Sequence, residues 1–277
     1  MTGRTLRRAA VDVAAVLVAA VVFLVPFAFM LLQAAKTSDE AGNLDYHLPT
    51  QWNIVQNVKD AFAARDYMLV TAFRNSIILT VASVAVLVVL CSMVGFVLQR
   101  RPGPVATVVN LLVLSGLIIP PAIVPTIWVL QKLHLFKTLP GLILVMIAFN
   151  MSFCVLLFRA FIAAIPRELD EAAMIDGCTG LKLFFRVIFP LLRPVIITVI
   201  ITTSVAIFND FVNPLYFLPG DENATVQLTL YNFMSQFNND YNLLFTDIVL
   251  ITVPPLVLYI FFNRKIVSGM TAGAVKG

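Results

Sequence analysis

The chain has 277 residues, of which 60% are hydrophobic and only 12% are charged, and its mean hydropathy is +0.94. A soluble domain carries roughly a quarter charged residues. This composition excludes an ordinary soluble domain even though the formal net charge is +4. We predict a protein that crosses the lipid bilayer several times and has no nucleic-acid partner.

Long apolar runs separate the charged segments along the chain. A membrane-spanning helix needs about 20 mainly apolar residues, and six runs reach this length alone or with the apolar residues beside them. We therefore predict an all-α integral membrane protein that forms a single domain over residues 1–277. The predicted spans are residues 12–34, 75–98, 105–130, 139–160, 194–216 and 243–263.

The first predicted span follows Arg4, Arg7 and Arg8, as the apolar part of a signal peptide would. A signal peptide has an apolar stretch of only about 7–15 residues, whereas no charged residue occurs in the longer run 13–35. We therefore interpret this run as an uncleaved first helix.

Lysine and arginine are unevenly divided between the connections. Both termini and the connections after the second and fourth spans hold 13 of the 19 Lys and Arg residues. Basic residues concentrate on the cytosolic side of membrane proteins. We predict that both termini, the turn at 99–104 and the loop at 161–193 lie in the cytosol, as in a multi-pass protein of a bacterial cell membrane.

Titratable residues form no cluster suited to catalysis or metal binding. The three cysteines, Cys91, Cys154 and Cys178, lack the spacing of metal ligands. The two histidines, His47 and His134, fall in predicted external connections. We expect no catalytic residue, no metal site and no cofactor on this chain.

Prolines interrupt two predicted spans: Pro120, Pro121 and Pro125 in the third, and Pro254 and Pro255 in the sixth. Proline removes a backbone donor and kinks a helix. Two interpretations stay open, namely that the kinks only shape the helix bundle or that they belong to a moving part of a transport pathway.

The loop between the fourth and fifth spans carries a short acidic segment, "ELDEAAMIDGCTG", at residues 168–180. The carboxylates of its first turn suit the positive end of a helix dipole, and Gly177 suits a helix end in the left-handed conformation. Thr179 is a candidate N-cap for a second short helix. The segment predicts two short helices whose alanines and carboxylates offer a surface to another protein. A loop resting on lipid headgroups is the alternative, although such helices favour Lys and Arg.

The stretch "EAAMIDGCTGLKLFFRVIFP" resembles the EAA loop of ABC importer permeases. The chain departs from that pattern at Cys178, Val187 and Phe189, which stay small or apolar. The whole chain resembles the carbohydrate-uptake group, of the maltose permease G type, in its six predicted spans and in the stretches "LPTQW", "FNDF" and "IVSGMTAGAVKG". The matching EAA positions are Glu171, Ala172, Ala173, Asp176, Gly177, Phe184 and Pro190.

This resemblance implies a mechanism and a set of partners. The EAA segment would dock on a cytosolic ATPase dimer, with Glu171 as its electrostatic contact and Gly177 as its turn. ATP would then switch the helix bundle between inward-facing and outward-facing states. A second homologous permease and an extracytoplasmic solute-binding protein would complete the importer. The C-terminal tail, residues 264–277, would also reach the ATPase interface. The tail residues concerned are Ser268, Gly269, Thr271 and Gly273.

The chain contains no Gly-Lys dipeptide, so it lacks a phosphate-binding loop of the GxxxxGK[ST] type. ATP and Mg²⁺ would therefore be bound by the partner ATPase and not by this chain. We accordingly predict a permease subunit rather than an enzyme.

Asp210 lies within the apolar stretch of the predicted fifth span, flanked by Asn209 and Asn213. An acid inside a membrane is costly and usually faces a bundle interior or water. These amides and this carboxylate are able to hydrogen-bond sugar hydroxyls, which makes the three residues candidates for a translocation pathway. The alternative is that Asp210 only caps or locks a helix, and Asp247 in the sixth span poses the same choice.

The sequence favours the transmembrane subunit of an ATP-driven carbohydrate importer. A permease of the same fold for glycerol phosphate or another small solute is one alternative. An ion-coupled secondary transporter that uses Asp210 and Asp247 as relays is another, but it would leave the EAA segment unexplained.

Overall fold

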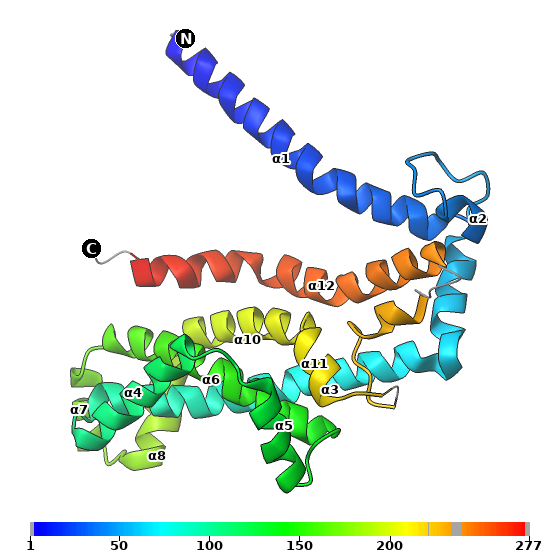
Figure 1. The fold of residues 1–277 in the computed structure, drawn as a ribbon. Helices are drawn as coiled ribbons and strands as arrows, with labels where there is room; N and C mark the ends of the chain where they lie inside the picture. Colours follow the sequence, from blue (N-terminus) through cyan, green and yellow to red (C-terminus); the bar gives the residue numbers. More distant parts are fainter. Residues whose placement is uncertain (1–2, 221, 234–239, 275–277) are drawn as a thin grey trace. The chain divides into compact units, whose positions relative to one another are not determined.

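The structure is a computed structural model that describes residues 3–220, 222–233 and 240–274, with side chains described for 11–220, 222–231, 233 and 240–262. Every regular element in these ranges is a helix, which confirms the predicted all-α class (Figure 1). In chain order the elements are α1 (Gly3–Ala35), α2 (Ser38–Ala41), α3 (Ile54–Arg100), α4 (Pro104–Ile118), α5 (Ile123–Lys132), α6 (Leu139–Ala163), α7 (Glu168–Ile175), α8 (Gly180–Leu183), the π-helical turn η1 (Phe184–Ile188), α9 (Phe189–Leu191), α10 (Arg193–Phe208), α11 (Val212–Phe217), the 3-10 helix η2 (Thr229–Phe233) and α12 (Tyr241–Ala274).

Within the described residues, four helices are long and apolar enough to cross a membrane, namely α1, α3, α6 and α12. The number becomes five if Gly180–Leu191 and Arg193–Phe208, which meet at 76°, form one bent span. The arrangement with six spans and the cytosolic placement of both termini therefore stay predictions, and so does the single domain.

The predicted third span, residues 105–130, is wrong as a single helix. The structure ends α4 at Ile118 and begins α5 at Ile123, so the run is divided into helices of 15 and 10 residues. Pro120 and Pro121 explain the break, because proline lacks the N–H of a helical hydrogen bond and pushes the preceding residue into an extended conformation.

The predicted fifth span, residues 194–216, is also interrupted. Helix α10 ends at Phe208 and α11 begins at Val212. The carboxylate of Asp210 accepts a hydrogen bond from the backbone N–H of Asn213 at 3.1 Å, which starts a new helix after the break.

Helix α12 continues past the predicted end of the sixth span, residue 263, to Ala274. The basic residues Arg264 and Lys265 end the apolar run, but Lys and Arg are good helix formers. Helix α3 begins at Ile54 and breaks at residues 64–67, where three successive residues have positive φ.

The described chain groups into two compact units, which are treated separately. Unit 1 comprises Met1–Val70 with Leu228–Val253, and unit 2 comprises Thr71–Gln227 with Pro254–Gly277. Helices α3 and α12 contribute residues to both units.

Polar side chains hold the C-terminal end of α1 within unit 1. Asn57 of α3 donates hydrogen bonds to the carbonyl oxygens of Ala34 and Lys36 at 2.9 and 2.8 Å. Asn242 of α12 in turn donates to the Asn57 side-chain oxygen at 3.0 Å. These bonds satisfy carbonyl groups that the end of a helix leaves without partners.

The segment after α1 folds back onto the end of that helix. The Nζ of Lys36, which is 2% exposed, lies 2.6 Å from one carboxylate oxygen of Asp45, and His47 Nδ1 lies 2.9 Å from the other. The hydrogen bond from Lys36, followed by that from His47, holds the pKa of the Asp45 carboxyl well below its usual range. This carboxylate therefore stays charged at any physiological pH.

Unit 2 contains the large apolar core, in which α3 and α4 pack closely against α6. At Gly95 of α3, an added Cβ would lie 3.1 Å from both Phe158 Cβ and the Arg159 backbone nitrogen of α6. At Gly116 of α4, an added Cβ would overlap the Ser152 hydroxyl. Small residues let helices in membranes approach in this way, so unit 2 places the ends of α3 and α6 side by side.

Candidate functional site

The acidic segment forms α7, and this helix ends in a sharp turn at Gly177. The N–H of Gly177 donates to the carbonyl of Met174 at 3.0 Å, and the N–H of Cys178 donates to that of Ala173 at 2.8 Å. This pair of bonds is the Schellman arrangement. Gly177 has a φ of +77° with nothing within 4 Å of an added Cβ. Backbone conformation rather than space therefore favours glycine here, as predicted.

The second half of the loop consists of α8, η1 and α9. Thr179 occupies the N-cap position of α8, but its side chain makes no capping hydrogen bond, so the predicted cap is wrong in that respect. The Phe184 side chain is 3% exposed, and its ring centroid lies 5.5 Å from that of Phe96 on α3 and 5.8 Å from that of Phe189. Phe184 thus attaches the loop to α3 by aromatic packing.

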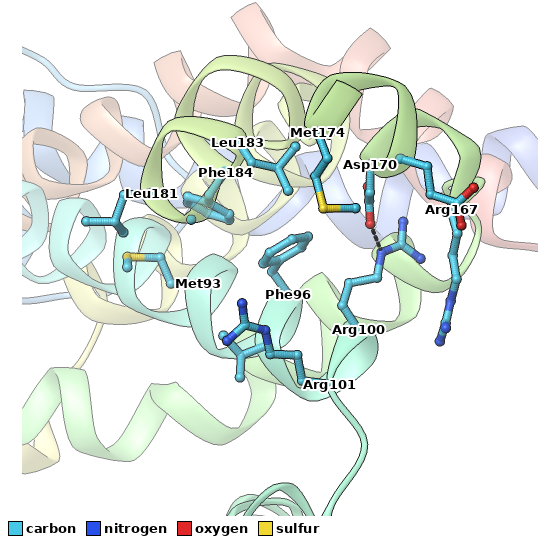
Figure 2. A pocket seen from close by; sticks show the side chains of 13 residues that line it. Met93, Phe96, Arg100, Arg101, Arg167, Asp170, Met174, Leu181, Leu183 and Phe184 are labelled. Carbon is cyan, nitrogen blue, oxygen red and sulfur yellow. Dashed lines mark ion pairs between the residues drawn. The ribbon is translucent and has the colours of Figure 1, made fainter. Parts of the chain in front are cut away.

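One side of α7 is attached to α3 by a buried ion pair (Figure 2). Asp170 Oδ2 lies 2.6 Å from Arg100 Nε, and the two side chains are only 11% and 9% exposed. Arg100 also donates from Nη2 to the carbonyl oxygen of Ile165 at 3.0 Å, just after α6. One arginine in the last turn of α3 therefore holds both ends of the short connection between α6 and α7.

Several side chains of α7 are exposed, and one of them, Glu171, also lines a cavity next to α3. The side chains of Glu171, Ala172 and Asp176 are all exposed, and Ile175 is 87% exposed. The alanine permits close approach, the carboxylates suit Arg or Lys of another chain, and the isoleucine offers apolar surface to bury. This face has the chemical character of a docking surface.

A cavity of about 450 Å³ lies between α7, α8 and the end of α3. Figure 2 shows Phe96 near its centre, with Arg100 and Arg167 on one side of that ring and Arg101 on the other. Met174 closes the cavity from the loop side. Because of this cavity, α7 is not packed solidly on α3 here, and the Arg100–Asp170 ion pair bridges the two helices beside it.

The predicted coupling residues differ in their exposure. Ala173 and Phe184 are buried and face inward, whereas the others are exposed. Those exposed residues are Glu171, Ala172, Asp176, Gly177 and Pro190.

The ion pair between Arg100 and Asp170 is not predicted from the sequence, in which neither residue is a candidate site residue. Residue spacing is the feature of the sequence that could have indicated a buried position for Asp170. Asp170 and Ala173 are three residues apart and share the buried helix face.

The residues predicted for a translocation pathway lie at the break between α10 and α11. Asp210 accepts hydrogen bonds from the backbone N–H of Asn213 at 3.1 Å and from its side-chain amide at 2.5 Å. Asn209 is exposed and accepts a bond from Gln227 at 3.3 Å. These bonds agree with the alternative in which Asp210 caps a helix. A pathway role for Asn209, Asp210 and Asn213 stays a prediction.

Two further predicted sites lie elsewhere. Asp247 is fully buried in α12 and accepts a hydrogen bond from Thr229 at 2.7 Å, which joins α12 to η2 within unit 1. The predicted tail contacts belong to the last part of α12, and their side chains lie outside the described residues. They are Ser268, Gly269, Thr271 and Gly273.

Residues 92–272 match the family of binding-protein-dependent transport system inner membrane components. The chain belongs to this family. It is therefore a multi-pass membrane protein and a transport permease rather than an enzyme, and the importer-permease resemblance of the EAA segment is confirmed.

Relatives extend the match along the chain. A probable starch degradation products transport system permease protein of Thermoanaerobacterium thermosulfurigenes is 30% identical over 262 residues, covering 94% of this chain and 94% of the relative. A diacetylchitobiose uptake system permease protein of Streptomyces coelicolor is 30% identical over 275 residues, covering 98% of this chain and 90% of the relative.

A solved structure shares the fold. It is a bacterial ABC transporter involved in the import of the acidic polysaccharide alginate, and it matches with a TM-score of 0.84 and 15% identity over 95% of this chain and 98% of that chain. A second, in complex with an alginate pentasaccharide-bound periplasmic protein, matches with a TM-score of 0.66 and 16% identity over 94% and 95% of the two chains. At this identity the likeness establishes the fold alone.

Proposed function

We propose that this chain is the transmembrane subunit of an ATP-driven importer that moves a carbohydrate into the cell. The observation that carries the proposal is helix α7, whose inner face is fixed by the Arg100–Asp170 ion pair and whose outer face is free to dock. The carbohydrate class rests on the relatives, whose printed names include starch degradation products and diacetylchitobiose.

The outer face of α7 docks on a separate ATPase in the cytosol. Glu171 pairs with an Arg or Lys of that partner, while Ala172 and Ile175 supply close apolar contact. ATP and Mg²⁺ bind on the ATPase, because this chain lacks a phosphate-binding loop of the Gly-Lys type. The C-terminal part of α12, with Ser268 and Thr271, reaches the same partner.

Arg100 transmits the movement of α7 to the membrane helices. A displacement of α7 acts through Asp170 on the last turn of α3 and, through the Ile165 carbonyl, on the end of α6. Phe184 adds a second attachment to α3 through its contact with Phe96. Distant sites in a transporter are coupled when such a packed network can adopt two discrete arrangements.

Two more proteins complete the proposed importer. A second, homologous permease pairs with this chain to enclose the pathway in a bundle of six spans each, with all four termini in the cytosol. An extracytoplasmic solute-binding protein delivers the sugar, and the neighbour solved with a periplasmic protein supports this arrangement.

Reconstitution tests the proposal directly. The chain is placed in liposomes with its partner permease, ATPase and solute-binding protein, and uptake of labelled mono- and oligosaccharides is measured with ATP inside. We expect uptake that requires ATP and the binding protein. Uptake driven by an ion gradient without ATP, or ATP-dependent uptake of glycerol phosphate but of no sugar, would contradict it.

A further inference from the structure

A second cavity in unit 2, of about 600 Å³, runs between the end of α3 and the start of α4. Its walls are apolar and include Leu90, Val94 and Val97 on α3 and Val105 and Val109 on α4. Its volume lies within the range of ligand clefts, roughly 300–1,000 Å³. This α3–α4 groove is therefore large enough for a ligand and suited to a hydrocarbon chain.

Arg101 is the one charged residue of the groove lining, and it stands where the groove meets the cavity beneath α7. Met93, Val97 and Arg101 line both spaces. Figure 2 shows the Arg101 guanidinium on the Met93 side of Phe96, away from the Arg100–Asp170 pair. Among the described side chains Arg101 makes no ion pair, so its charge is available to a ligand.

The first turn of α4 adds a second source of positive potential at the same end of the groove. Helix α4 begins at Pro104, no side chain caps it, and its residues Val105 and Ala106 line the groove. The N–H groups of a first turn have no partner within the helix, and the positive end of a helix dipole attracts anions. The groove thus has an apolar length and a single cationic end.

We propose that the α3–α4 groove binds one anionic phospholipid, with an acyl chain along α3 and α4 and the phosphate at Arg101 and the first turn of α4. The proposal rests on the proposed cytosolic placement of the turn at 99–104, because anionic lipids of the cytosolic leaflet bind in basic pockets between spanning helices. The bound headgroup forms part of the wall of the cavity between α7 and α3, so the lipid helps to hold α7 in place.

Native mass spectrometry of the importer, purified in detergent with its partner chains, tests the lipid site. Phosphatidylglycerol and phosphatidylcholine are added in equal amounts, and we expect retention of one phosphatidylglycerol in preference. Arg101→Gln should weaken that retention about fivefold, which is the effect of one basic residue near an anionic surface. Val97→Trp, which fills the groove without changing the charge, should also displace the lipid.

Arg186→Gln is the matched control, because Arg186 is exposed and lines neither cavity. Equal retention of the two lipids, or equal losses in Arg101→Gln and Arg186→Gln, would overturn the proposal. Displacement of the lipid by inorganic phosphate would reassign the site to a free anion. Cross-linking of Val97→Cys to the partner permease in the assembled importer would instead assign the groove to protein. If α7 does not dock on an ATPase, the retention of phosphatidylglycerol should be unchanged. Failure of the proposed function can therefore be distinguished from failure of the lipid site.

Discussion

Two aspartates of unit 2 stand at the start of short helices, and they are held in different ways. Asp170 of α7 is buried and pairs with Arg100, which belongs to a helix distant in the sequence. Asp210 is half-buried beside α11 and pairs with the backbone and the side chain of Asn213, three residues further on. The first interaction joins separate elements, whereas the second shapes a single turn. The role of an acid in this apolar chain therefore depends on which element supplies its partner.

The two arrangements also differ in energy. Removing one partner of a buried ion pair typically costs about 3–5 kcal/mol, because an uncompensated charge is left behind. Losing an N-cap costs about 1 kcal/mol. Substitutions around α7 should therefore abolish most of the uptake, whereas substitutions around α11 should reduce it only slightly.

Asp170→Leu should have the largest effect. It leaves the Arg100 guanidinium buried without its carboxylate, which should destabilise the loop by about 3–5 kcal/mol and reduce uptake at least about a hundredfold. Uptake by membrane vesicles and limited proteolysis of residues 161–193 measure the two consequences.

The double variant Arg100→Met with Asp170→Leu is the control for that experiment. It removes both charges, so it should recover part of the resistance to proteolysis. Uptake should stay low, because the attachment to the Ile165 carbonyl is lost as well. A double variant no more resistant than Asp170→Leu alone would show that the ion pair does not hold the loop.

Glu171→Lys should leave the protein inserted in the membrane but weaken its co-purification with the ATPase. Reversing the charge places like charges together, and we expect about a thirtyfold loss of affinity, roughly 2 kcal/mol. Glu222→Lys makes the same charge change at an exposed residue outside the loop and should have no effect. Unchanged ATPase binding and uptake in Glu171→Lys would remove the docking role of α7.

Gly177→Ala should destabilise the end of α7 by about 1–2 kcal/mol, which is the cost of the left-handed conformation for a residue with a Cβ. No neighbour obstructs the new methyl group, so the effect is purely conformational. Hydrogen exchange of the α7 amides measures it. Gly177→Asn should cost less, because asparagine tolerates this conformation, and equal losses in the two variants would contradict the explanation.

Asp210→Asn should have the smallest effect, slowing uptake by less than about tenfold, or 1.4 kcal/mol. Asparagine keeps an oxygen that can accept the bond from the Asn213 N–H, so the start of α11 survives. Uptake assays at saturating binding protein measure the change. Complete loss of uptake would instead give Asp210 a direct role with substrate or protons.

The sequence predicts features that are encoded locally. The carboxylates and alanines of 168–175 and the glycine at 177 determine a short helix and its end, and the structure has both there. The helical class follows from composition, because a chain in lipid must satisfy its backbone hydrogen bonds internally. Hydropathy does not report backbone continuity, so the breaks that the structure shows in the third and fifth predicted spans are not predicted from it.

Interactions between distant elements are the part that the sequence does not reveal. The partner of Asp170 is decided by where the end of α3 meets the start of α7, and nothing near residue 170 specifies residue 100. The capping of Asp210 is easier to anticipate, since Asn213 lies three residues away, within reach of an aspartate side chain at a helix start. The sequence accordingly predicts the exposed face of α7, whose docking role stays a prediction, but not the Arg100–Asp170 ion pair that attaches α7 to α3.

The contact at Gly95 limits how far α3 and α6 can move relative to each other near Arg100. Gly95 lies about one and a half helical turns before Arg100, and there α3 meets Phe158 and Arg159 of α6 so closely that an added Cβ would lie only 3.1 Å from each. Close packing of this kind leaves no slack between the two helices. We therefore expect the two helices to move together, and Arg100 lies on α3 just beyond this contact. In the proposed coupling, a larger residue in place of Gly95 would push α3 away from α6 and change the transmitted movement without removing the Arg100–Asp170 ion pair.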